Sequence, residues 1–98
     1  MPHERRTVTG RYVLVPNPCT TEPCLPGLAY AVETGAACYL LTVRGRWSAV
    51  EGDWGDARVE PGAVVTVTGM VSEQVDRRGD RFQTIEVEAL SRARESPP

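Results

Sequence analysis

Two runs of alternating apolar and polar residues near the C-terminal end of the chain predict a β-hairpin. Valines occupy alternate positions in residues 63–71, and apolar residues alternate with threonine and glutamate in residues 82–90. A period of two with many β-branched residues is typical of strands. The polar segment between them contains Gly79, which adopts a positive φ at no steric cost. The pattern predicts antiparallel strands with one face towards a core and one towards water.

The N-terminal half shows the same pattern in three shorter runs. Residues 7–15 alternate, with Gly10 as an interruption that predicts a bend or bulge. Residues 28–33 and 37–43 are apolar runs separated by a Thr-Gly-Ala turn at 34–36, which predicts a second hairpin.

Two segments lack any regular period. Residues 16–27 contain four prolines and a glycine, which exclude a regular helix or a central strand and predict a long, stiffened loop. The link from 44 to 62 is rich in glycine and acidic residues. A short helical turn is expected within it, with Ser48 as N-cap and Glu51 three residues later.

Together these segments predict one domain at residues 7–90, with tails at 1–6 and 91–98. The strands are expected at residues 7–15, 28–33, 37–43, 63–73 and 81–90. The residues expected to form the core are Val8, Leu14, Val32, Leu40, Val65, Val67, Val71, Ile85 and Val87.

Composition limits the possible functions without choosing among them. A chain of 98 residues with 41% hydrophobic content suits a single small domain. The net charge of −2 gives no global attraction to nucleic acid or to acidic membranes, although all eleven basic residues are arginine. No run is long enough for a membrane helix and no signal peptide is visible, which predicts a cytoplasmic protein unless its cysteines are bonded.

The strand order and three short motifs resemble the OB-fold. The motifs are Thr9-Gly10 in the first run, Tyr39-Leu40-Leu41 in the third, and PGAVVTVTG at residues 61–69, where Ala63 replaces the usual acidic residue. The resemblance extends to small bacterial OB-like domains and covers roughly residues 7–90. It implies an all-β, five-stranded Greek-key barrel with an irregular link between strands three and four. It implies no particular activity.

Three alternatives remain for the cysteines. Cys19 and Cys24 could form a disulfide, which would require an oxidising compartment. Cys19, Cys24, Cys38 and His3 could instead bind a metal, although this spacing is loose for zinc. All three thiols could also be free, and Cys38 is expected in the core.

The residues favour a non-enzymatic protein without a cofactor. His3 lies in the tail, so no nucleophile has a positioned base. Glu86 and Glu88 stand two apart on the water-facing side of a strand, the ordinary position for charge.

The OB resemblance implies a binding surface on strands two and three and on the loops after strands one and four. A protein or peptide partner is favoured, with the 16–27 loop as the epitope. Single-stranded nucleic acid is the alternative; it would need exposed tyrosines beside a basic patch, and the patch is expected to be too acidic for strong binding. The candidate ligand-binding residues are Tyr30, Tyr39, Arg44, Arg46, Trp47, Arg77, Arg78 and Arg81, with Trp54 as a further aromatic.

Overall fold

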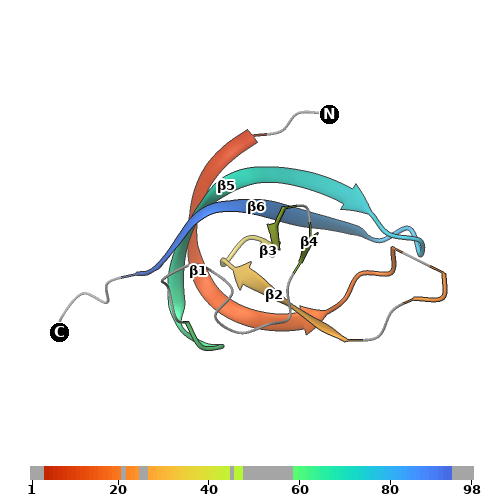
Figure 1. The fold of residues 1–98 in the computed structure, drawn as a ribbon, viewed down its shortest axis with the longest axis horizontal. Helices are drawn as coiled ribbons and strands as arrows, with labels where there is room; N and C mark the ends of the chain where they lie inside the picture. Colours follow the sequence, from red (N-terminus) through yellow and green to blue (C-terminus); the bar gives the residue numbers. More distant parts are fainter. Residues whose placement is uncertain (1–3, 21, 25–26, 45, 48–58, 94–98) are drawn as a thin grey trace.

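The computed structural model describes residues 4–20, 22–24, 27–44, 46–47 and 59–93, for positions 46 and 47 the backbone only. This described part of the chain is all-β, with strands joined by loops and turns (Figure 1). The strands are β1 (Glu4–Pro16), β2 (Leu28–Glu33), β3 (Cys38–Val43), β4 (Arg46–Trp47), β5 (Val64–Val75) and β6 (Arg81–Arg92).

Five of these strands form one sheet that closes in a ring. The order is β2-β1-β5-β6-β3, and β3 pairs with β2 to complete the ring. β3 and β6 are parallel, and the other neighbours are antiparallel. The short β4 pairs with the end of β3. β1 joins the two sides of the ring, since residues 4–11 pair with β5 and residues 11–16 pair with β2.

Two glycines lie where the strands of the ring approach each other most closely. A Cβ at Gly10 would lie 2.3 Å from the carbonyl oxygen of Glu33, and one at Gly69 would lie 2.0 Å from that of Glu86. The pairing of β5 with β6 also shifts register at Gly69. The bend predicted at Gly10 therefore falls where β1 passes from one strand partner to the other.

The inside of the ring is the main core. Tyr12 and Tyr30 stack there with ring centroids 4.7 Å apart. Aliphatic side chains from all five ring strands surround them, together with Val59 from the segment before β5. The buried residues of this cluster are Tyr12, Tyr30, Val32, Tyr39, Leu41, Val59, Val65, Val67 and Ile85.

A second, smaller cluster lies on the opposite face of β1, β2 and β3. Ala29, Ala31 and Leu40 are buried in it, and Val13 and Phe82 are among the half-buried side chains packed against them. The middle of the outward face of β2 and β3 is thus apolar and buried, while Glu33 and Cys38 at the strand ends are exposed.

The predicted all-β class and the strand positions agree with the structure, with differences at the ends. β1 begins at Glu4, within the predicted N-terminal tail, and β6 continues to Arg92. β5 extends to Val75. Strands of this length occur because the β5–β6 hairpin is paired over nearly its whole length and β1 follows β5 back to Glu4. The predicted helical turn at 48–51 lies outside the described residues.

The predicted core is correct in its centre and wrong at one end. Val32, Leu40, Val65, Val67 and Ile85 are buried, while Val8, Val71 and Val87 are half-buried against the inner cluster. Leu14 is 40% exposed, so its assignment to the core is wrong. It shares the face of Tyr12 and lies opposite Tyr30, but it is two residues nearer the end of β1 and lies outside the buried cluster. No helix in the described part of the chain is long and apolar enough to cross a membrane.

Candidate functional site

A hydrogen bond and a disulfide join residues within the loop between β1 and β2. The amide of Asn17 donates to the carbonyl of Gly27 at 3.0 Å, which closes the base of the loop. A disulfide joins Cys19 to Cys24 with their Cα atoms 4.8 Å apart, so the structure adopts the first of the three alternatives for the cysteines. Cys19 is buried and Cys24 is exposed. Among the described residues no cluster of His, Cys, Asp or Glu could hold a metal ion, and His3 lies outside them.

The loop between β5 and β6 is organised by the carboxylate of Asp76. It accepts hydrogen bonds from the amides of Arg78 at 2.9 Å and Asp80 at 3.0 Å. Gly79 takes a φ of +86° at the turn, as its position in the sequence predicts. Partial burial by itself would raise the pKa of Asp76, but the amide donors of Asp80, Arg78 and Cys19 outweigh it and hold that pKa below its usual value.

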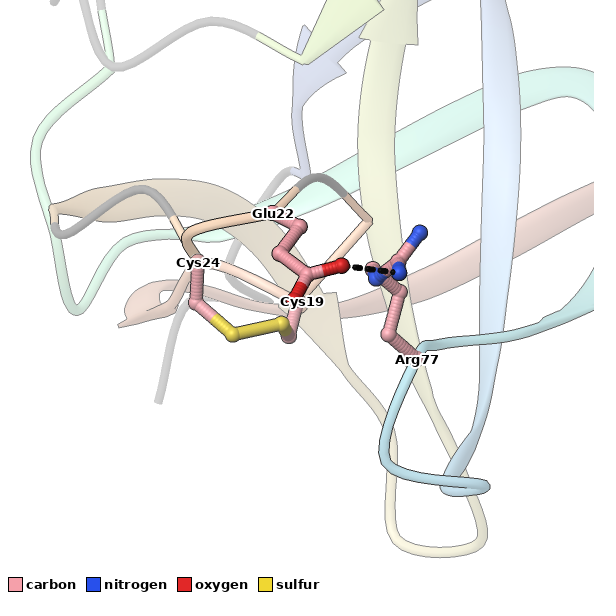
Figure 2. Close-up of polar contacts among 4 residues, drawn as sticks. All are labelled: Cys19, Glu22, Cys24 and Arg77. Atoms are coloured by element: carbon pink, nitrogen blue, oxygen red, sulfur yellow. Dashed lines mark hydrogen bonds and ion pairs between the residues drawn. A yellow bond between two sulfur atoms is a disulfide. The ribbon is translucent and has the colours of Figure 1, made fainter.

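The two loops are bound to each other through both polar groups of the Cys19 backbone. The Cys19 amide donates to the Asp76 carboxylate, and the Cys19 carbonyl accepts a 2.7 Å hydrogen bond from the amide of Arg77. The guanidinium of Arg77 also reaches Glu22, with 2.7 Å between Nη2 and Oε2 (Figure 2). The disulfide and the hairpin turn therefore hold one continuous surface, which we call the loop junction: Cys19, Glu22, Cys24 and residues 76–80.

Charges of both signs lie close together at the loop junction. Arg77 and Arg78 lie beside Asp76, Asp80 and Glu22, and all but the half-buried Asp76 are exposed. Further along the hairpin, Arg81 pairs with Glu73 at 3.5 Å. The arginines of the hairpin therefore do not form a uniformly basic patch, because each of them has an acidic residue close by.

Tyr30 and Tyr39 do not form the exposed aromatic platform that nucleic-acid binding would need. Tyr30 and Tyr39 are only 5% and 6% exposed, and both belong to the core inside the ring. Alternation along β2 and β3 turns Ala29, Ala31 and Leu40 outwards instead, and these residues are themselves covered. Tyrosines that fill the ring cannot stack on nucleobases.

Arg44, a further candidate, does not join the loop junction. Arg44 is exposed, with a positive φ of 55°, just after the end of β3. Arg81 lies just before one end of the parallel pairing between β3 and β6, and Arg44 lies beyond the other end. At the rise of a strand, the two arginines are about 20 Å apart. The side chains of Arg46 and Trp47, and all of Trp54, lie outside the described residues.

A surface depression of about 390 Å³ lies between the β2–β3 turn and the start of β6. Its lining includes Cys38, which is exposed, so its assignment to the core is wrong: β3 starts at this residue and its side chain faces away from the ring. Burial around the thiol and, secondly, the Glu33 carboxylate raise the pKa of Cys38. A thiol with a raised pKa is a weak nucleophile, so the depression has no activated group among its lining residues.

Glu22, Asp76 and Asp80 of the loop junction were not selected individually as site residues from the sequence, although Glu22 lies in the 16–27 loop that was. Glu22 and Asp76 are ordinary acidic residues in polar segments, and the Cys19 backbone gives no sequence signal. The Asp-x-x-Gly-Asp spacing at 76–80 does predict an aspartate-capped turn, because aspartate bonds amides a few residues ahead. The contact between this turn and the β1–β2 loop depends on tertiary structure, so the spacing does not predict it.

No protein-family model, no curated protein and no solved structure matches this chain.

Proposed function

We propose that this protein is a non-enzymatic binding module with an OB-like Greek-key barrel, and that its loop junction engages a protein or peptide partner. The order of the strands supports the OB-like part of the proposal. β1, β2 and β3 follow one another, and β5 returns through a long connection to lie beside β1. A return of the fourth strand to the first defines the Greek key, and OB domains bind ligands through the two loops that meet here.

The observation that carries the proposal is the double anchoring of Cys19. Its amide and its carbonyl are both held by the hairpin, so neither loop has to be ordered when a partner arrives. Ordering a loop on binding costs affinity, and a surface fixed in advance avoids that cost. Charges of both signs on such a surface fit the mixed charge of another protein better than the uniform charge of a polyanion.

The single-stranded nucleic-acid alternative has little support. Binding of that kind needs stacking aromatics beside a cationic groove. Tyr30 and Tyr39 are buried, and the arginines of the hairpin lie among carboxylates.

The disulfide supports an oxidising compartment as the place of action. Bonds of this kind form and persist outside the reducing cytosol. The expectation of a cytoplasmic protein gives way to this proposal because Cys19 and Cys24 are bonded.

The test uses a photoreactive amino acid placed at Arg78, on the loop junction, and in a second protein at Ser91, an exposed residue near the end of β6. Each protein is irradiated in extract from its source cells, and the cross-linked protein is identified and purified. We expect the partner to cross-link through position 78 only. With the purified partner, Arg77→Ala should weaken binding by about tenfold or more, since anchoring residues of an interface carry most of its energy.

Arg92→Ala is the matched control, because Arg92 is an exposed arginine on β6 away from the junction, and it should bind as the wild type does. Equal cross-linking from both positions, or equal affinity of Arg77→Ala, would overturn the proposal. Binding of a single-stranded oligonucleotide that weakens steeply with salt would replace it with the nucleic-acid function.

A further inference from the structure

One edge of the sheet is open along the first half of β1. β2 ends at Glu33, opposite Arg11, and the chain then turns away into β3. Within the described residues, positions 4–10 pair with β5 on one side and have no strand partner on the other. The close approach at Gly10 marks the point where β1 bends away from β2. We call residues 5–9 the open edge.

The hydrogen bonds of Tyr12 fix which amides point towards this edge. Its amide donates to Ala63 and its carbonyl accepts from Gly62, so both point towards β5. Successive residues of a strand point their amides to opposite sides. Because the pairing with β5 runs from Arg11 to Glu4 without a register shift, the amides and carbonyls of Arg5, Thr7 and Thr9 point to the open side.

Exposed arginines are concentrated along the same strand. Three arginines, Arg5, Arg6 and Arg11, lie in β1; Arg6 pairs with Glu4 at 2.9 Å and Glu33 lies opposite Arg11. Exposed ion pairs of this kind are weak and leave the guanidinium groups open to an incoming carboxylate. Arg5 and Arg11 share the outward face with Thr7 and Thr9, and the Arg5 side chain is 67% exposed with Glu88 at 3.3 Å. The residues of β5 that pair with this half of β1 carry no charge.

From these features we infer that the open edge accepts an extended acidic peptide segment as an added antiparallel strand. The peptide backbone pairs with Arg5, Thr7 and Thr9, and acidic side chains opposite Arg5 and next to Arg11 meet the two arginines. Main-chain bonds supply affinity in this mode of recognition, and alternate side chains supply specificity. The inference concerns a surface separate from the loop junction and does not depend on the function proposed for it.

Charge decides against the other occupants of such an edge. Pairing of two copies through their open edges would bring the arginines of both chains together, and like charges across a strand pair are unfavourable. A nucleic acid would satisfy the arginines, but its backbone cannot pair with alternating amides and carbonyls.

The probe is a short capped peptide that alternates threonine and valine and carries glutamates four residues apart. The control peptide carries lysines in place of the glutamates. Titration is followed by NMR. We expect the glutamate peptide to shift the amides of Arg5, Thr7 and Thr9 and to slow their hydrogen exchange. The lysine peptide should not bind. Thr7→Pro removes one amide on the open side and should lower the affinity about tenfold, whereas Arg5→Glu with Arg11→Glu should abolish binding.

Three controls separate edge pairing from indirect effects. Thr68→Ala removes the 2.9 Å hydroxyl pair between Thr7 and Thr68 without touching the edge, and should bind within about twofold of wild type. Arg92→Glu changes charge elsewhere and should bind as wild type. If Thr7→Pro misfolds, a peptide N-methylated at the pairing amides replaces it and should fail to bind.

Several results would overturn the inference: equal binding of the N-methylated or lysine peptide, shifts confined to the loop junction, or dimers that form through β1. Preferential binding of an oligonucleotide at the open edge would overturn it as well. Arg77→Ala should leave peptide binding unchanged, so failure of the loop-junction function is distinguishable from failure here.

Discussion

Asp76 is the residue on which the loop junction most depends, through its carboxylate. It accepts amides from its own turn and, across the junction, from Cys19. Replacement by a neutral residue would leave these amides with a weaker acceptor, because hydrogen bonds to a charged group are the stronger ones.

We expect the junction to loosen in acid because the pKa of Asp76 is lowered in the folded state. A lowered pKa stabilises the fold above the unfolded value of about 4, and this contribution is lost as the pH falls through the folded-state value. An NMR titration of the Cys19 amide should show its transition below about pH 4. Asp76→Asn should remove the transition and Asp80→Asn should keep it; a transition above the ordinary aspartate range would contradict the assignment.

The candidate residues show what single positions in a sequence can and cannot reveal. Tyr30 and Tyr39 sit in alternating strands, so the pattern places each on a definite face but does not say which face lines the ring. Cys19 and Cys24 are close enough in sequence for a disulfide, yet the same spacing allows free thiols. Burial against partners far along the chain settles both questions, and a sequence pattern does not contain that information.

At the level of elements, the bend of β1 at Gly10 determines the shape of the sheet. Gly10→Ala should destabilise the protein by about 1–3 kcal/mol, because a Cβ there would lie 2.3 Å from a backbone oxygen that must move. Gly35→Ala is the matched control, since a Cβ at Gly35 meets no atom within 4 Å. Its effect should stay within about 0.5 kcal/mol. Urea denaturation measures both, and equal effects would contradict the close approach.

The register of β5 can be tested by a pair of neighbouring substitutions. Val67 is fully buried inside the ring, and Val67→Ala should cost about 1–3 kcal/mol of unfolding free energy. Thr66 lies on the other face and bonds Thr9 at 3.0 Å on the exposed side, so Thr66→Ala should cost at most about 1 kcal/mol. Denaturant melts of the two variants decide the register, and the reverse order would place β5 one residue out of step.

The sequence located these elements well because local signals act at their ends. Alternation predicted β1, β5 and β6, short apolar runs predicted β2 and β3, and the Thr-Gly-Ala turn and Gly79 predicted the two hairpins. The extra lengths of β1, β5 and β6 were missed because pairing with a neighbouring strand, and not strand propensity, decides where a strand ends. Such pairing extends β1 back to Glu4 and β6 on to Arg92.

At the scale of the whole molecule, charge and apolar surface are distributed in a way that composition hides. The net charge of −2 combines an arginine-rich first strand, an uncharged first part of β5 at residues 64–71 and a turn of mixed sign between β5 and β6. The apolar middle of the outward face of β2 and β3, at Ala29, Ala31 and Leu40, is buried. The open edge and the loop junction are therefore two separate surfaces with distinct chemistry, one rich in backbone groups and arginine and the other rigid and of mixed charge.

The disulfide connects the loop junction to the stability of the whole molecule. Cys19→Ser with Cys24→Ser should lower the unfolding free energy by about 2 kcal/mol, the loop-entropy value for so short a loop. It should also speed hydrogen exchange at the Arg77 amide, whose acceptor is the Cys19 carbonyl. Cys38→Ser is the control, because Cys38 is exposed and unbonded, and its effect should stay within about 0.5 kcal/mol.

Thiol titration of the denatured, unreduced protein checks the bond directly: one reactive thiol, that of Cys38, should be found. Three reactive thiols, or an Arg77 amide that exchanges equally fast in wild type and double variant, would mean that the loop junction is held without the disulfide.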